Sequence, residues 1–362
     1  MVTRRESKAK SSPPPRIYHN GITMLFLLYF CMELLDGFDA AAVERAASLL
    51  REGGVVAFPT ETVYGLGADA CNADAAAKVF ELKKRPRFDP LIVHISRKEW
   101  LADLIRSTSP KARLLMDRFW PGPLTIILEK TALIPDIVTA GLQTVGIRMP
   151  GHPAALNLIE RLGRPIAAPS ANPFGYMSAT TARDVANLFD GRLQLILDGG
   201  PASFGIESTI VSVRDGVVRI HRHGGVTAEQ LAEVVGNVDE RGDDGETCES
   251  PGSLPYHYAP HAPLRIIRTP FEIELENSAF LAFREPRVPV RARRVRVLSS
   301  RGDMREAAAG FFSYLIELDA AAPEIIYAEA IPERGLGKAM MERLRKAARK
   351  AGDIGSNIPS LP

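Results

Sequence analysis

Short apolar runs alternate with amphipathic stretches along most of the chain, and this alternation predicts an α/β fold. Apolar runs bounded by Pro, Gly or polar clusters are typical of buried strands, whereas apolar residues three or four positions apart are typical of helices. The runs predict strands at 55–58, 91–95, 124–128, 144–149, 165–168, 193–197, 208–213 and 217–222. The helical spacing predicts helices at 40–52, 74–84, 97–106, 110–118, 154–162, 181–189 and 228–235.

Two of these helices carry capping signals. Asp39 stands directly before the helix at 40–52, where its carboxylate can accept backbone N–H groups of the first turn. Thr227 and Gln230 have the spacing of a capping box before the helix at 228–235. These signals fix where both helices should begin.

The pattern changes between Asn237 and Pro263, where Asp, Glu, Gly and Pro dominate and no periodicity remains, as in a linker. Beyond it, apolar runs alternate with helical stretches again, which predicts a second, smaller α/β unit. Its expected strands are 265–267, 279–283, 294–298 and 324–327, and its expected helices are 303–318 and 335–350. The predicted organisation is a first domain at 35–236, a linker at 237–263, a second domain at 264–351 and a tail at 352–362.

The N-terminal residues imitate a signal peptide. Residues 1–20 are basic and rich in Pro and Ser, and an apolar run follows at 22–32. However, no small-residue cleavage site follows, and the run is too short to span a bilayer. The alternative is that translation starts at Met32, with residues 1–31 a disordered leader or upstream coding sequence. We favour this alternative and expect residues 1–31 to contribute nothing to the core.

Composition adds bounds. The 362 residues suit two domains, and a net charge of +2 makes no strong case for nucleic acid or membrane partners. Three widely spaced cysteines (Cys31, Cys71 and Cys248) offer neither a disulfide framework nor a zinc site, so we expect a reducing, cytoplasmic location. The basic run 291–296 permits contact with RNA, but arginines around an apolar strand are more typical of a solvated face, which we favour.

The stretch from Val55 to His94 has the layout of a ligand site. A strand stops at Pro59, and the polar loop that follows contains Thr60, Glu61, Thr62 and Tyr64 and the two expected turn glycines, Gly65 and Gly67. The next helix delivers Lys83, Lys84 and Arg85 at its C-terminal end, and a second strand carries His94. Open α/β sheets place anionic ligands at such strand ends. The alternative for the cations is a solvated helix end.

Other catalytic patterns fail on their spacing. Gly65-x-Gly67 stands too far from the preceding strand for a dinucleotide loop, and the run at 335–339 lacks the residues that a phosphate-binding P-loop needs. Ser170 lacks the glycine elbow of a hydrolase, and the histidines match no metal-ligand spacing. Polar side chains just past strand ends remain as the candidate chemistry. They are Thr60, Thr62, His94, Thr144, Arg148, Ser170, Asn172, Ser208 and Arg222. Together with Lys83 and Arg85, they suit a substrate with carboxylate and phosphate groups.

The polar segments also match a known family in its own order. They are PTETVYGLG, K-x-R-P at 83–86, PLIVH, WPGPLT, T-x-x-x-R-M-P at 144–150, H-P, APSAN, DGG, ESTI and YHYAP. Over about 35–350, the chain resembles the Sua5/YrdC family of threonylcarbamoyl-AMP synthases, in its long form with a C-terminal domain. Ten motifs in order make the resemblance specific, although any one of them is weak.

The resemblance implies a twisted α/β YrdC-like domain with a large electropositive cavity and a Rossmann-like C-terminal domain. It implies the reaction of L-threonine, bicarbonate and ATP to threonylcarbamoyl-AMP and pyrophosphate, with Mg²⁺ carried by ATP. A separate tRNA threonylcarbamoyl transferase complex would take the product. In the linker, the proline-rich residues 251–261 would form a lid over the cavity, the alternative being a passive tether.

The resemblance also assigns the site residues by motif. The threonine side comprises Thr62, His94, Arg148, Ala168 and Ser208. The nucleotide side comprises Arg85, Asp89, Thr144, Ser170, Ser178, Arg222 and Tyr258, while Lys83 and Asn172 complete the catalytic pairs with Arg85 and Ser170. The residue chemistry agrees, because Arg148 can hold a carboxylate in a bidentate fork and the other cations can offset phosphate charge.

Three positions depart from the family pattern. Lys84 stands where Gly or Asn is frequent, and Ser253 stands where Met is common. Asp89 replaces the usual Asn and places a carboxylate near the expected ATP. Two rival functions stay open: a double-stranded RNA-binding module, and a carbamoyl-transferring relative on the same fold. The YHYAP segment favours the synthase over the second rival.

Overall fold

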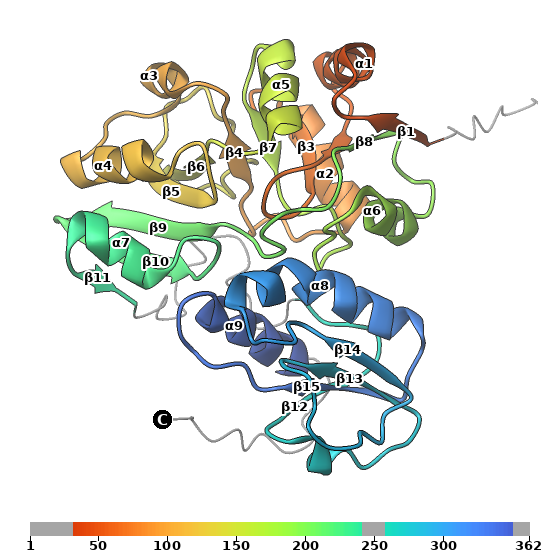
Figure 1. Ribbon diagram of the computed structural model, residues 1–362. Helices are drawn as coiled ribbons and strands as arrows, with labels where there is room; N and C mark the ends of the chain where they lie inside the picture. Colours follow the sequence, from red (N-terminus) through yellow and green to blue (C-terminus); the bar gives the residue numbers. More distant parts are fainter. Residues whose placement is uncertain (1–31, 241–257, 350–362) are drawn as a thin grey trace, which may run out of the picture. The chain divides into compact units, whose positions relative to one another are not determined.

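The structure is a computed structural model that describes residues 32–240 and 258–349. A mixed sheet is built from residues 33–239, and a parallel sheet is built from residues 264–329 (Figure 1). The strands of the mixed sheet are β1 (Glu33–Asp36), β2 (Val56–Phe58), β3 (Gly65–Asp69), β4 (Ile92–His94), β5 (Leu124–Glu129), β6 (Thr144–Arg148), β7 (Ile166–Ala168), β8 (Leu195–Asp198), β9 (Thr209–Arg214), β10 (Val217–Arg222) and β11 (Val238–Asp239). Their order across the sheet is β1-β8-β2-β3-β7-β4-β6-β5-β9-β10-β11.

Helices pack on both faces of this sheet. They are α1 (Ala40–Arg51), α2 (Ala73–Lys83), α3 (Leu101–Leu104), α4 (Pro110–Phe119), α5 (Pro153–Leu162), α6 (Ala182–Phe189) and α7 (Ala228–Val235). Apolar residues of α1 and α5 share one core cluster with β2, β7 and β8. Apolar residues of α2, α4, α6 and α7 form a second cluster with the opposite side chains of the strands. The strands are therefore buried on both faces, as their continuous apolar runs predict.

Strand alternation leaves one part of the sheet polar. Val93, Ile126 and Ile147 point into the core beneath α2 and α4, so their strand neighbours point to the other face. His94 and Arg148 lie on that other face, and they are partners in the parallel pairing of β4 with β6. The sheet register itself thus brings these two side chains together.

The second sheet is entirely parallel, with the order β12-β15-β13-β14. Its elements are β12 (Leu264–Ile267), the 3₁₀ turn η2 (Pro270–Glu272), β13 (Ser278–Ala282), β14 (Arg294–Val297), α8 (Met304–Ala320), β15 (Ile325–Glu329) and α9 (Leu336–Arg349). Residues of α8 and α9 share an apolar cluster with Val63, Tyr176, Met177 and Ile206, which belong to loops of the mixed sheet. The two sheets are therefore joined through these helices.

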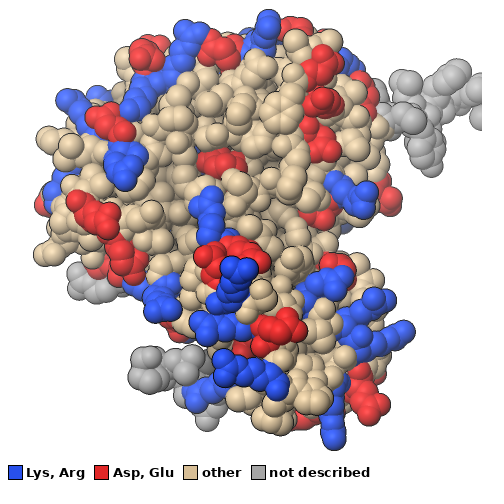
Figure 2. Space-filling view, viewed as in Figure 1, with Lys and Arg blue, Asp and Glu red and all other residues tan. Residues whose placement is uncertain are grey.

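The structure confirms most of the predicted elements and both predicted caps. Asp39 accepts the backbone N–H groups of Ala41 and Ala42, and Thr227 and Gln230 form the expected capping box. The arginines at 291, 293 and 294 are exposed around β14, whose Val295 and Val297 pack on the core, so the solvated-face interpretation of this run fits. On the face in Figure 2, basic side chains are interspersed with acidic ones.

Three expectations were wrong. Gly65 and Gly67 are not turn residues but lie in β3, where a Cβ on Gly67 would stand 2.5 Å from Ile166 and 2.7 Å from Phe58. The helix expected at 97–106 is shortened to η1 (Lys98–Trp100) and α3, because Ile105 turns extended and bridges to Lys130. The edge strand β1 was missed, because its four residues follow the apolar run assigned to the leader.

No helix in the described ranges, 32–240 and 258–349, is long and apolar enough to cross a membrane. The expected leader at 1–31, most of the expected lid and the tail at 352–362 lie outside these ranges.

Candidate functional site

A cavity opens on the polar face of the mixed sheet, along β4 and beside the last residues of β6 and β7. It is lined by Thr60, Thr62, Val63, Tyr64, Gly65, Arg85, Ile92, His94, Arg148, Ala168, Pro169, Ser170, Glu207, Ser208, Arg222 and Tyr258. All five residues assigned to the threonine side are in this lining, and so are four of the seven assigned to the nucleotide side. The sequence motifs therefore converge on one cavity, although they span almost two hundred residues.

Arg148 is buried and its fork is already engaged. Its Nη2 lies 2.7 Å from Oε1 of Glu61, and its Nη1 donates to Oγ1 of Thr62 at 2.9 Å. Thr62 Oγ1 in turn lies 2.9 Å from Oγ1 of Thr60. The carboxylate that Arg148 was expected to hold is thus supplied here by Glu61, a loop residue with no role in the sequence prediction. An incoming carboxylate would meet the same guanidinium.

His94 is a neutral hydrogen-bonding group. Burial, reinforced by the charge of Arg148, lowers the pKa of His94 to about 3. Its Nδ1 lies 3.1 Å from the carbonyl oxygen of Ile92. A carbonyl can only accept, so Nδ1 carries the proton and Nε2 is left as an acceptor. The ring therefore presents a fixed tautomer at the cavity wall.

The Lys83–Ser170–Asn172 group forms a buried support. Lys83 Nζ donates to the carbonyl oxygens of Ser170 and Asn172, each at 2.5 Å, and Ser170 Oγ donates to Asn172 Oδ1 at 2.5 Å. Burial, reinforced by the charge of Arg85, holds the pKa of Lys83 well below its ordinary value. Only Ser170 of the three lines the cavity. Lys83 and Asn172 therefore contact the loop that carries Ser170 and do not themselves line the cavity.

Arg85 lines the cavity and is held by Asp89 from behind. Arg85 Nη2 lies 2.7 Å from Oδ1 of Asp89 and donates to the carbonyl oxygen of Pro90 at 2.9 Å. Arg85 Nε donates to the backbone oxygen of Asp89 at 3.0 Å. Asp89 is fully buried and lies outside the cavity lining. The aspartate that replaces the usual Asn at this position thus forms an ion pair with Arg85.

The remaining wall is built around Ser208. Arg222 Nε donates to the Ser208 carbonyl at 3.1 Å, and Arg222 Nη2 lies 3.1 Å from Ser208 Oγ. Ser208 Oγ also lies 2.8 Å from Oγ1 of Thr125 on β5. Tyr258 is buried and stacks on Phe312 of α8, with 5.6 Å between ring centroids. Burial raises the pKa of Tyr258 above its ordinary value, so its phenol keeps its proton.

Two further residues assigned to the nucleotide side, Thr144 and Ser178, also lie outside the lining. Thr144 begins β6 and shares a face with Arg148, but the strand separates them by four residues, or roughly 13 Å. Ser178 is fully buried and donates to Oε1 of Glu207 at 2.5 Å. A direct role for either in nucleotide binding stays a prediction.

Sequence reasoning missed three charged residues near the site: Glu61, Glu207 and Arg343. Glu61 and Glu207 stood inside the PTET and ESTI motifs, but their neighbours drew the assignments. Arg343 occupies a core-facing position of α9, beside Met340, Leu344 and Ala347. An arginine in an apolar stripe was the signal that would have found it.

The described residues hold no cluster of three or more His, Cys, Asp or Glu side chains arranged for a metal. The one carboxylate in the cavity lining, Glu207, is already bound by Ser178 and by Arg343, whose Nε lies 2.9 Å from its Oε2. Mg²⁺ usually keeps several waters and binds through substrate phosphates with one or two carboxylates. These residues thus fit a Mg²⁺ held mainly by a nucleotide.

Comparisons with known proteins point to one family. Residues 48–224 match the Sua5/YciO/YrdC family model, which is described as "Telomere recombination". Residues 226–349 match the family model described as "Threonylcarbamoyl-AMP synthase, C-terminal domain". The chain is 46% identical to the threonylcarbamoyl-AMP synthase of Bacillus subtilis, over 84% of this chain and 92% of that protein. It is 40% identical to that of Pyrococcus abyssi, over 84% of this chain and 94% of that protein.

A solved structure agrees over nearly the whole length. Sua5 from P. abyssi, crystallised in complex with L-threonine, superimposes with a TM-score of 0.81 at 37% identity. The match covers 88% of this chain and 98% of that one. Full-length similarity at this identity extends through both sheets and the helices that join them. The chain therefore belongs to the Sua5/YrdC family, in the form that carries the Sua5 C-terminal domain.

Proposed function

We propose that this protein is an L-threonylcarbamoyladenylate synthase, which converts L-threonine, bicarbonate and ATP into threonylcarbamoyl-AMP and pyrophosphate. One observation carries the proposal beyond family membership: a single cavity joins a neutral histidine and a buried arginine to two further arginines, a serine and a tyrosine. The histidine and the buried arginine suit an amino acid. The two further arginines, the serine and the tyrosine suit a nucleoside triphosphate.

On the amino-acid side, the carboxylate of threonine pairs with the guanidinium of Arg148, which now holds Glu61. The hydroxyl donates to a fixed acceptor, for which His94 Nε2 is the best placed by its tautomer. Thr62 and Ser208 offer further hydroxyl partners in the same lining. A pocket that hydrogen-bonds this hydroxyl rejects valine, which has a methyl group in its place.

In the reaction, the amine of threonine takes up bicarbonate with loss of water and becomes a carbamate. A carbamate oxygen then attacks the α-phosphorus of ATP, the bond to the β-phosphate bridge breaks, and pyrophosphate leaves. Arg85 and Arg222 offset the charge on the phosphates, and Ser170 orients them. When bound with ATP, Mg²⁺ supplies further charge neutralisation. A tRNA-modifying transferase would consume the labile product.

The test is mass spectrometry of the product after incubation with threonine, ¹³C-bicarbonate and Mg-ATP, alongside pyrophosphate release. We expect a threonine-dependent adenylate that carries the isotope. Serine should be a weak substrate, since it keeps the hydroxyl and loses a methyl contact worth about 1–3 kcal/mol. Valine should be weaker still. Pyrophosphate release that ignores threonine, or preference for valine over serine, would contradict the proposal.

Pure RNA binding is the remaining rival, and nothing in the described structure favours it over synthesis. A salt-sensitive affinity for double-stranded RNA in a protein that makes no adenylate would revive it.

A further inference from the structure

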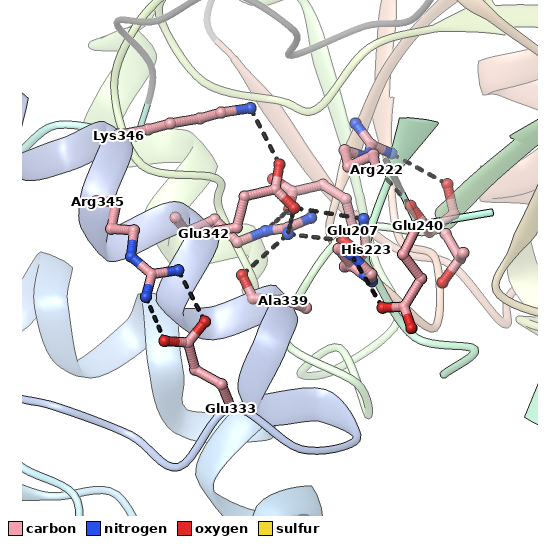
Figure 3. A network of polar contacts seen from close by, with 12 residues as sticks. Glu207, Arg222, His223, Glu240, Glu333, Ala339, Glu342, Arg345 and Lys346 are labelled. Carbon is pink, nitrogen blue, oxygen red and sulfur yellow. Dashed lines mark hydrogen bonds and ion pairs between the residues drawn. The ribbon is translucent and has the colours of Figure 1, made fainter. Parts of the chain in front are cut away.

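Helix α9 of the C-terminal domain places the buried guanidinium of Arg343 directly behind the cavity wall. Arg343 is 1% exposed, and its Nε lies 2.9 Å from Oε2 of the cavity-lining residue Glu207. Its Nη1 donates to the backbone oxygens of His223 and Ala339, at 2.7 and 3.0 Å. Figure 3 shows this network between α9 and the strands of the mixed sheet. The contact thus joins the C-terminal domain to the domain that contains the mixed sheet.

Arg343 is an expensive choice for a packing position. Its helical neighbours Met340 and Leu344 belong to the apolar cluster that joins α8 and α9 to the mixed sheet. Buried ion pairs recover their desolvation cost poorly, and apolar residues of similar size are often more stabilising. Stability alone is therefore a weak reason for an arginine here. What it contacts offers a better one.

Two groups of the cavity lining converge on this guanidinium. The first is the carboxylate of Glu207, which also accepts from Ser178 at 2.5 Å. The second is the ring of Tyr258, whose centroid lies 5.4 Å from Arg343 Cζ, within range of a cation–π contact. One residue of the C-terminal domain thus contacts two side chains of the cavity lining.

Two arginines, Arg343 and Arg222, act on the charge of Glu207. Burial by itself raises the pKa of Glu207, but Arg343 and Arg222 outweigh it and hold that pKa below its ordinary value. Glu207 likewise favours the charged form of Arg222. Arg343 therefore offsets part of the carboxylate charge that acts on Arg222. Without Arg343, more of the negative charge of Glu207 would remain beside Arg222, which would weaken the attraction of this wall for phosphate.

We propose that Arg343 is a positioning residue for ATP, acting through Glu207 and Tyr258, and that the C-terminal domain reaches the reaction through this contact. The inference rests on the proposed function, because it takes the wall around Arg222 as the nucleotide side. It predicts that loss of Arg343 weakens the binding of ATP far more than the binding of threonine. A contact that only joins two domains would weaken both substrates alike.

The experiment compares full-length Arg343→Met and Arg343→Lys with wild type. Arg345→Met serves as the matched control, since Arg345 lies on the same helix and pairs with Glu333 inside the C-terminal unit. KM for ATP and for threonine would be measured by pyrophosphate release, with melting temperature followed in parallel. We expect KM for ATP to rise roughly tenfold in Arg343→Met, within the usual range of coupling between sites. The KM for threonine should change little, Arg343→Lys should be intermediate, and the control should match wild type.

The double variant Arg343→Met with Glu207→Gln tests the route. If Arg343 acts by occupying the carboxylate, removal of that charge should recover part of the ATP affinity. No recovery, or equal losses for ATP and threonine, would overturn the inference. If Arg343→Met does not fold, Arg343→Lys carries the same comparison. ATP binding by calorimetry separates this inference from the proposed function, because it needs no product: a wild type that binds ATP without making adenylate defeats only the function.

Discussion

Buried charges at the cavity are matched residue by residue. Arg148 pairs with Glu61 and Arg85 with Asp89, each at 2.7 Å and almost without solvent exposure. Burying any of these charges without a partner would be costly. The carboxylates therefore stabilise the buried arginines until an anionic substrate binds. Asp89, which stands where the family usually has Asn, therefore holds Arg85 in place.

Arg85 should be needed for turnover. Because its removal alone breaks a buried ion pair, which typically costs about 3–5 kcal/mol, the test replaces both partners, Arg85→Met with Asp89→Asn. Losing a charge that faces the phosphates of ATP typically costs about 3 kcal/mol, so we expect roughly a hundredfold fall in kcat. Asp89→Asn alone is the control. Pyrophosphate release near the wild-type rate in the folded double variant would remove Arg85 from the mechanism.

His94 should make the fold sensitive to mild acid. Its pKa is about 3 when folded and about 6.5 when unfolded, so the unfolded chain binds the extra proton as pH falls below about 6.5. The contribution of His94 is fully present above that pH and is lost toward pH 3, by up to about 1.4 kcal/mol per pH unit. Urea unfolding at pH 7 and pH 5 should show a smaller pH difference for His94→Gln than for wild type. Equal differences would show that the imidazole charges freely in the folded protein.

At the scale of elements, the close packing of β3 against its neighbours determines the structure of the PTETVYGLG segment. Strand β3 pairs with β2 and β7, and the Phe58 side chain crosses over both of its glycines. Glycine here serves contact between elements and not a turn, since neither residue has a positive φ. The polar loop of Thr60, Glu61 and Thr62 is consequently held between two short, tightly packed strands.

Gly67→Ala should overpack this region. The new Cβ would stand 2.5 Å from Cγ2 of Ile166 and 2.7 Å from Cε1 of Phe58, so core side chains must move. Overpacking typically costs about 1–3 kcal/mol, which thermal or urea unfolding would detect. Gly151→Ala is the matched control, because its Cβ would meet its nearest atom at an ordinary 3.5 Å. A Gly67 variant as stable as wild type would mean that β3 has room to shift.

At the scale of the whole molecule, the C-terminal unit contributes to the cavity as well as to stability. Tyr258 and Arg343 come from the chain beyond the mixed sheet, and Tyr176 donates to Asp319 of α8 at 2.6 Å. Asp319 also accepts the backbone N–H of His261, three residues after Tyr258. The chain segment that bears Tyr258 is thus tied to both units.

Truncation after Gly236 should therefore abolish efficient synthesis. It removes Tyr258 and Arg343 and uncovers the apolar residues Val63, Met177 and Ile206 that now pack with α8 and α9. We expect a less stable protein whose threonine-dependent pyrophosphate release falls sharply, or whose ATP hydrolysis proceeds without adenylate. Unfolding curves would separate instability from lost chemistry. Synthesis at the full-length rate by the truncated chain would show that the mixed sheet alone suffices.

The sequence by itself determined most of the elements, the family and most of the cavity lining. Apolar period and capping chemistry are local properties, so helices such as α1 and α7 were predictable from a few residues. Ordered motifs placed Thr62, His94, Arg148 and Ser208 in one site, because each ends a strand of the same sheet or lies in a loop next to one. Tertiary structure alone decided which charges meet. Glu61 with Arg148 and Glu207 with Arg343 are buried pairs of residues far apart in the sequence, so only the fold reveals that these charges meet.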